Sequence, residues 1–262
     1  MPFFDTHAHL DQAEFDADRG DVIRRAMEAG VETILCVGVD AASSAAAVDL
    51  AEEHPAVRAA IGIQPNSRDA MTDTEWQRIV ELAGHPRVVA LGETGLDRYW
   101  DSTPLPLQQE YFARHLRLSQ DRDIPIIVHC RDAQQETLAI LRAAAACGPL
   151  RGAMHAFSGD TAFAAECLSL GLHLSFAGNV TYTNKKFAAL REAAAAVPAD
   201  RLLIETDSPY LTPHPLRGKQ RRNEPALILH TAASLAALRG VSVEELAAQT
   251  TANARSLLRC RS

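Results

Sequence analysis

The chain has 262 residues and an apolar fraction of 47%, so it is long enough to bury a sizeable hydrophobic core. Its formal net charge of −7 argues against broad electrostatic capture of duplex DNA, which depends on many lysine and arginine contacts with phosphates. It contains no apolar run of about eighteen residues and no secretory signal pattern near its N-terminus, so we expect a cytoplasmic protein that does not interact with membranes.

Short apolar segments alternate with helix-length stretches rich in Ala, Leu, Glu and Arg along the whole chain. This alternation is typical of repeated β-α units around a parallel sheet. We predict eight strands, at residues 2–8, 31–39, 57–63, 88–95, 124–130, 151–157, 172–178 and 201–206. Helices are predicted to follow the strands, among them 41–53, 104–121, 132–146 and 184–196.

Eight β-α units in about 250 residues match the size of a (β/α)8 TIM barrel. A doubly wound sheet is the alternative, although it more often has five or six strands. Since no linker or change of composition divides the chain, we expect one domain over residues 1–262. The one long irregular segment, 208–225, follows the eighth strand and is rich in proline and basic residues. An irregular segment of this length is usually functional or disordered.

Six side chains that can bind metals fall at the ends of predicted strands, where a parallel barrel builds its active site. They are His7, His9, Glu93, His129, His155 and Asp207. His7 and His9 are two residues apart, so both can point from one strand into the barrel mouth. Taken singly, each residue has an ordinary structural alternative, such as a helix N-cap for Asp207. Their joint position at one rim favours a metal site, and the other six histidines do not share that position.

These residues lie in motifs that resemble the TatD family of metal-dependent hydrolases, in the amidohydrolase-like barrel superfamily. The motifs are DTHAHLD at 5–11, GETGLD at 92–97, VHCRDA at 128–133, MHAFSG at 154–159, ETDSPYL at 205–211, and RGK with RNEP within 217–225. The resemblance implies that His7, His9, Glu93 and Asp207 bind one metal ion. It also implies that Glu93, His129 and His155 bind a second ion, with Glu93 bridging the two. The implied activity is divalent-metal-dependent hydrolysis of DNA phosphodiester bonds, as in a TatD-like deoxyribonuclease.

Three positions depart from the family pattern. Gln64 and Asn66 in GIQPN stand where the family commonly has histidines, and Thr183 in TYTN replaces a basic residue. The basic stretch RGKQRRNEP is two residues longer than usual. All six expected metal ligands are retained, so these departures concern how the substrate is held.

The residues themselves suit phosphodiester hydrolysis, which needs charge neutralisation and a nucleophile available at neutral pH. Two divalent ions would supply both needs, the nucleophile as a metal-bound hydroxide. Asp207 would then be a ligand and the acceptor of the proton from water, with Glu93 as its catalytic partner. Many enzymes of this superfamily bridge their metals with a carbamylated lysine. None of the three lysines lies on a predicted strand end, so Glu93 is the better bridge.

Mixed histidine and carboxylate ligation suits Zn, Mn, Co or Fe, whereas Mg prefers shells richer in oxygen. We therefore expect two divalent metal ions, Zn or Mn as bound, with Mg as an alternative working ion.

Basic and polar side chains near the predicted rim are candidates for substrate binding. They are Arg131, Arg217, Lys219, Arg221 and Arg222, together with Gln64 and Asn66. Arginine is suited to bidentate contact with phosphate, although a solvated basic loop is the plain alternative for the run after residue 216. We expect the substrate to be DNA at its ends or in single strands, because an acidic chain grips long duplex poorly.

Two other functions remain open from the sequence, and no obligate protein partner is inferred. The same metal chemistry could hydrolyse a small amide, cyclic amide or ester if Gln64 and Asn66 reshape the pocket. A catalytically impaired metal-binding module is the third reading, and it requires the changed positions to have abolished turnover.

Overall fold

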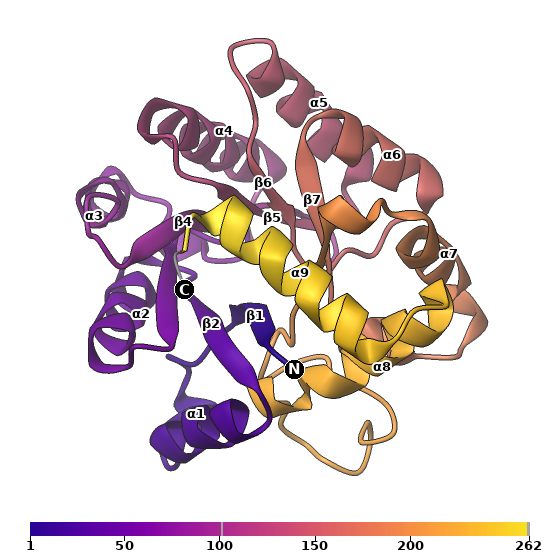
Figure 1. Ribbon diagram of the computed structural model, residues 1–262. Coiled ribbons are helices and arrows are strands. Elements are labelled where there is room, and N and C mark those ends of the chain that lie inside the picture. Colours follow the sequence, from indigo (N-terminus) through magenta and orange to yellow (C-terminus); the bar gives the residue numbers. More distant parts are fainter. Residues whose placement is uncertain (101, 261–262) are drawn as a thin grey trace.

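Eight parallel strands form one sheet in the order of the sequence, in a computed structural model that describes residues 1–100 and 102–260 (Figure 1). The strands are β1 (Phe3–Ala8), β2 (Val31–Val37), β3 (Val57–Ile61), β4 (Val88–Asp97), β5 (Ile126–Arg131), β6 (Gly152–Met154), β7 (Leu172–Phe176) and β8 (Leu202–Ile204). Each strand pairs in parallel with the next.

Helices surround the sheet (Figure 1). They are α1 (Arg19–Glu28), α2 (Ala41–Glu53), α3 (Asp73–Leu82), α4 (Leu105–Arg122), α5 (Gln134–Ala145), α6 (Thr161–Ser169), α7 (Ala188–Ala196), α8 (Ile228–Arg239) and α9 (Val243–Leu258). Local sequence sets several of their starts. Capping boxes formed by Asp40 with Ser43 and by Ser242 with Glu245 satisfy backbone N–H groups at the first turns of α2 and α9.

The barrel closes where the chain beyond β8 meets β1. The Asp207 N–H donates to the His7 carbonyl at 2.9 Å, and the His9 N–H donates to the Ser208 carbonyl at 2.8 Å. Below them the buried carboxylate of Asp5 accepts hydrogen bonds from the Thr206 N–H at 2.9 Å and the Thr206 hydroxyl at 2.6 Å. The (β/α)8 barrel is thus confirmed. Its closure brings the histidine motif near the start of the chain next to the aspartate that follows β8.

One end of the barrel is filled by α9, which lies across it in Figure 1. Inward side chains such as Phe4, Leu35 and Ile127 form an apolar cluster with Leu257 and Leu258 of α9. A separate and larger core lies between the strands and the surrounding helices. Because apolar packing closes the N-terminal end of the strands, a polar site can form only at their C-terminal ends.

The predicted elements differ from the observed ones mainly at this C-terminal rim. β6 and β8 are shorter than predicted, since side-chain carboxylates accept from alternate backbone N–H groups there, while the N–H groups of His155 and Glu205 still donate to carbonyls of the neighbouring strands. For example, the N–H of Ala156 donates to the carboxylate of Glu205. β4 extends two residues beyond the prediction and pairs with β5 as far as Asp97. The helix predicted at 184–196 begins at 188, after a 3₁₀ turn.

Among the described helices, none is by itself long and apolar enough to cross a membrane. The segments Pro225–Arg239 and Val243–Leu258 pass such a test together, by length and composition, but they are bent by 108°.

A buried histidine on α4 makes the stability of the fold sensitive to acid. His115 accepts a hydrogen bond from the Ile63 N–H through Nε2 and donates from Nδ1 to the Tyr111 carbonyl, so it is neutral when folded. Burial lowers its pKa from 6.5 to about 4. The unfolded chain therefore binds a proton more readily, and stability is complete above pH 6.5 and falls as the pH drops towards 4. We expect this residue alone to remove about 3 kcal/mol across that window.

Urea unfolding at pH 7 and pH 4.5 measures the effect, with His115→Gln as the comparison because glutamine can accept the same hydrogen bond without titrating. The loss of stability on acidification should be smaller in His115→Gln than in the unaltered protein. An equal loss in both proteins would contradict this assignment.

Candidate metal centre

Six side chains predicted as metal ligands meet at the C-terminal ends of the strands. His7 lies in β1 and His9 just after it, Glu93 lies in β4, His129 lies in β5, and His155 and Asp207 follow β6 and β8. All are buried except His129, which is partly exposed. Residues up to 200 positions apart in the chain thus share one centre.

The first pair of imidazoles comes from β1. The Nε2 atoms of His7 and His9 lie 3.2 Å apart. Both nitrogens face the Glu93 Oε2 atom, at 3.5 Å and 3.7 Å respectively. The spacing of two residues therefore does direct both rings to the same place.

The second pair comes from adjacent strands. His129 Nδ1 and His155 Nε2 lie 3.3 Å apart. They face the other oxygen of Glu93, Oε1, at 2.7 Å and 3.2 Å. One glutamate thus lies between two pairs of imidazoles, with one oxygen towards each pair.

The local backbone of β4 explains how Glu93 reaches this position. The register shifts between Leu91 and Thr94, where three steps along β4 match two along β5. Such a bulge changes the direction of a side chain and is frequent beside active sites. Gly92 and Gly95 permit the close approach of β4 to β5, because a β-carbon at Gly95 would lie 2.0 Å from the His129 carbonyl oxygen. The two glycines of GETG are therefore required for β4 to pack this closely against β5.

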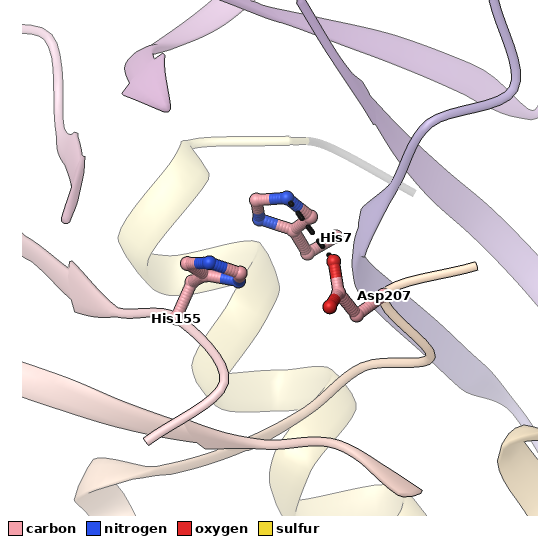
Figure 2. Close-up of side chains that lie close together, drawn as sticks. All are labelled: His7, His155 and Asp207. Carbon is pink, nitrogen blue, oxygen red and sulfur yellow. Dashed lines mark ion pairs between the residues drawn. The ribbon is translucent and has the colours of Figure 1, made fainter. Parts of the chain in front are cut away.

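Asp207 completes the group from the closing seam of the barrel. Its Oδ1 lies 3.6 Å from His9 Nε2 and 3.8 Å from His7 Nε2. Figure 2 shows Asp207 beside His7, whose ring stacks on that of His155 with centroids 3.9 Å apart. The β1–β8 closure therefore adds a second carboxylate to the first pair of imidazoles.

Hydrogen bonds on the outer nitrogens direct lone pairs into the centre. His9 Nδ1–H donates to the Val37 carbonyl at 2.8 Å, and His129 Nε2–H donates to Asp97 at 3.0 Å. His155 Nδ1–H donates to Glu205 at 3.2 Å. A nitrogen that keeps its proton on the outer side of the ring leaves the inner nitrogen free as a metal ligand.

The distances fit a metal. With bonds of about 2.0–2.1 Å, two nitrogen ligands of one tetrahedral zinc ion lie about 3.3 Å apart. The two imidazole pairs are separated by 3.2 and 3.3 Å. The separation within each pair is therefore the one expected for two ligands of a shared cation.

The electrostatics favour a cation at the same place. Burial by itself would raise the pKa of Glu93, but the charge of His155 and hydrogen bonds with His129 and His155 hold it well below its usual range. Burial likewise would lower the pKa of His155, whereas the charge of Glu93 and the hydrogen bond with Glu205 raise it well above its usual value. An ionised glutamate deep in the barrel mouth thus attracts positive charge, which is a proton on the inner nitrogen of His155 without a metal and a metal ion that displaces this proton when one is bound.

Three groups of these side chains have ligand atoms close enough together to hold a metal ion. They are His7–His9–Glu93, Glu93–His129–His155, and His7–His155–Asp207. The first group holds three of the four residues that the family resemblance implies for one ion, without Asp207, and the second group is the set implied for the other ion, with Glu93 common to both. The third joins Asp207 to one histidine of each set, so Asp207 is near both.

Two carboxylates that were not among the predicted site residues accept hydrogen bonds from the outer nitrogens of the histidines. Asp97, at the end of β4, accepts from His129 and, at 3.0 Å, from the side-chain amide of Asn66. Glu205 accepts from His155 and from the Ala156 N–H at 2.7 Å. Both lie in the motifs GETGLD and ETDSPYL, which was the available signal. Their partners could not be deduced, because each contact joins different strands.

Glu205→Gln is expected to weaken metal binding without unfolding the protein. Glutamine keeps the size of the side chain but removes the charge that holds the His155 Nδ1 proton, and such partners typically contribute 10- to 100-fold to metal affinity. Competition with a chromophoric chelator measures the change. Glu192→Gln, at an exposed position of α7, is the matched control. Equal affinity in Glu205→Gln and the unaltered protein would refute the role.

The predicted substrate contacts divide into two groups. Arg131, Arg217 and Arg221 line a cavity of about 720 Å³ beside His129, His155 and Asp207. Lys186, which the sequence analysis did not assign, lines it too. Gln64 and Asn66 line a neighbouring cavity. All of these residues are therefore beside the candidate metal centre.

Lys219 and Arg222 are not among the lining residues of either cavity. The guanidinium of Arg222 forms two contacts of 2.7 and 2.8 Å with Asp18 near α1. This ion pair ties the basic loop to the barrel, so Arg222 has a structural partner away from the centre.

The family follows from the match of the whole pattern. The family model described as "TatD related DNase" matches residues 4–259. The chain belongs to the TatD family. It is accordingly a metal-dependent hydrolase, and the resemblance drawn from its motifs is confirmed.

Similar proteins of the TatD family align with nearly the whole chain. An "uncharacterized metal-dependent hydrolase YabD" from Bacillus subtilis is 43% identical over 98% of this chain and 98% of its own length. A "3'-5' ssDNA/RNA exonuclease TatD" from Klebsiella pneumoniae is 36% identical over 97% of both chains. The crystal structure of YJJV, a TatD homolog from Escherichia coli K12, has a TM-score of 0.92 and 28% identity and covers 99% of this chain and 98% of that chain.

Proposed function

We propose that this TatD-family hydrolase cleaves phosphodiester bonds of DNA, at ends or in single strands, with two divalent metal ions. The observation that carries the proposal is Glu93, whose two oxygens face separate pairs of imidazoles. In this proposal His7, His9, Glu93 and Asp207 hold one ion, and Glu93, His129 and His155 hold the other. Two ions bridged by a carboxylate neutralise phosphate charge and activate water at neutral pH.

Asp207 is proposed as the proton acceptor. Burial by itself would raise the pKa of Asp207, but hydrogen bonding with His9 and the charges of the histidines lower it. Its carboxylate is therefore ionised at neutral pH and can take a proton from the attacking water. Zn or Mn suits the mixed nitrogen and oxygen ligands, and Mg is the alternative working ion.

The basic cavity supports a polyanionic substrate. Arg131, Lys186, Arg217 and Arg221 gather beside the centre in a chain whose net charge is −7. Local positive charge in a cleft can hold phosphates that the acidic remainder of the surface repels. The relative from Klebsiella pneumoniae, named an exonuclease of single-stranded DNA and RNA, agrees with this substrate class.

The experiment that tests the proposal uses protein stripped of metal with a chelator and reloaded with Mn, Mg or Zn. It is assayed against labelled single-stranded DNA, duplex DNA and RNA, and against esters and cyclic amides. Cleavage of single-stranded DNA that returns with metal is the expected result. Turnover of esters or amides alone would favour the small-substrate alternative. Two bound metals with no turnover of any substrate would favour a metal-binding module.

A further inference from the structure

A second cavity, of about 740 Å³, opens from the metal centre and differs in chemistry from the basic one. It shares five lining residues with the basic cavity, namely His129, Arg131, His155, Asp207 and Leu211. Among its described lining residues, Arg131 is the one arginine or lysine. Its aromatic residues, Trp100 and Tyr210, are exposed, whereas those of the basic cavity, Tyr182 and Phe187, are buried or partly buried. The metal centre therefore lies between a strongly basic cavity and an aromatic one.

Trp100 is held at this second cavity although more than half of its side chain, 55%, is exposed. The backbone N–H groups of Tyr99 and Trp100 donate to Asp97 Oδ1 at 2.8 and 3.1 Å. The other oxygen of Asp97 accepts from His129. One buried carboxylate thus sets the orientation of an expected metal ligand and anchors the backbone from which the indole projects. An exposed indole adds little to folding stability here, whereas an aromatic surface beside a reactive centre suits a planar ligand.

Arg131 lies where the two cavities meet. Its guanidinium carbon is 3.6 Å from the centroid of the Tyr99 ring and 5.9 Å from that of Trp100. The rings of Tyr99 and Trp100 meet edge to face, with centroids 5.0 Å apart. Cation–π contact therefore orders this arginine between the aromatic surface and the basic cavity. A phosphate beside Arg131 would have a basic cavity on one side and an aromatic cavity on the other.

We propose that Trp100 is the stacking surface for the base of the terminal nucleotide, and that Arg131 contacts the phosphate joining that nucleotide to the rest of the strand. The inference rests on the proposed nuclease function and specifies its substrate subsites. The single cation of the aromatic cavity suits one nucleoside, whereas the several cations of the basic cavity suit the phosphates of a longer strand. A base must be unpaired and unstacked to lie on an indole, so this arrangement selects single-stranded ends.

Fluorescence tests the stacking without any turnover. The chain has two tryptophans, and Trp76 packs against Tyr111 and His115 on the helical side, so Trp76→Phe leaves Trp100 as the sole indole. Titration of this metal-loaded variant with deoxyadenosine monophosphate should quench its fluorescence, and deoxyribose 5-phosphate should not. If Trp76→Phe does not fold, the difference between the unaltered protein and Trp100→Phe gives the same signal. Equal responses to the two ligands would overturn the proposal.

Kinetics with abasic substrates test the same contact in the reaction. The unaltered protein should prefer a normal terminal nucleotide to an abasic one by about tenfold in kcat/KM, as expected for one stacked base. Trp100→Ala should lose this preference, and Trp100→Phe should keep most of it. An abasic site several nucleotides inward is the matched control and should have little effect. Leu238→Ala, an exposed change on α8, is the control variant.

The outcomes separate this inference from the proposed function. If single-stranded DNA is cleaved but Trp100→Ala keeps the preference for a terminal base, the nuclease function stands and the stacking role is wrong. If no nucleic acid is cleaved, the proposed function fails, and the fluorescence titration still decides whether Trp100 binds a base.

Discussion

Glu93→Gln is expected to lose both metal ions together and to reduce hydrolysis by roughly 10³-fold or more, because every route to charge neutralisation at this centre depends on the ions. The carboxylate lies within 2.7 to 3.7 Å of nitrogen atoms from four histidines. Glutamine has the same shape but carries no charge, and it can present an oxygen to one imidazole pair only. Metal content per chain, by mass spectrometry, and the rate of substrate hydrolysis are the two measurements.

Glu81→Gln, on the exposed side of α3, is the matched control and should keep both the metal content and the rate. Circular dichroism separates loss of metal from loss of the fold. Two metals per chain with an undiminished rate in Glu93→Gln would show that this glutamate is not the bridge.

Asp207→Asn is expected to reduce the rate by about 10²- to 10⁴-fold while the Glu93–His129–His155 group keeps its ion. The change removes the proposed proton acceptor and a charged ligand beside His7 and His9, but none of the three ligands of the other group. Backbone strain does not complicate the test, because Asp207 has a φ of 54°, a conformation that asparagine tolerates well. Rate constants and metal stoichiometry together distinguish this outcome from that of Glu93→Gln.

Asp123→Asn is the control for Asp207→Asn, since Asp123 has a φ of 51° and lies at the exposed end of α4. It should leave the rate and the metal content unchanged. A loss of less than tenfold in Asp207→Asn would rule out Asp207 as the proton acceptor.

Most side chains of the candidate metal centre could be identified from the sequence alone. The two-residue spacing of His7 and His9 and the position of His129 at the end of an apolar run were enough to propose a rim of ligands. They were enough because side-chain direction alternates along a strand and all strands of a parallel barrel end on the same face. Glu93 was also selected, although it lies within β4 and owes its direction to the bulge at 92–93.

The hydrogen bonds that orient the histidines could not be predicted from the sequence in this way. Nothing local in the sequence pairs Asp97 with His129, which are 32 positions apart, or Glu205 with His155, which are 50 positions apart. Each of these contacts joins two different strands or the segments that follow them. The basic loop shows the same limit. Arg217 reaches the cavity, whereas Arg222, five positions later, is held by Asp18. Charge and spacing alone could not distinguish them.

The linear order of residues thus specified the strands, the barrel and the identity of the candidate ligands, because periodicity and strand polarity are local properties of a chain. The packed barrel specified the rest. Closure of β1 against the segment after β8 placed Asp207 beside His7, the bulge in β4 directed Glu93 between two imidazole pairs, and the pairing of β4 with β5 brought Trp100 near Arg131. Such neighbours depend on register, bulges and closure, which are properties of the packed barrel and not of any short segment.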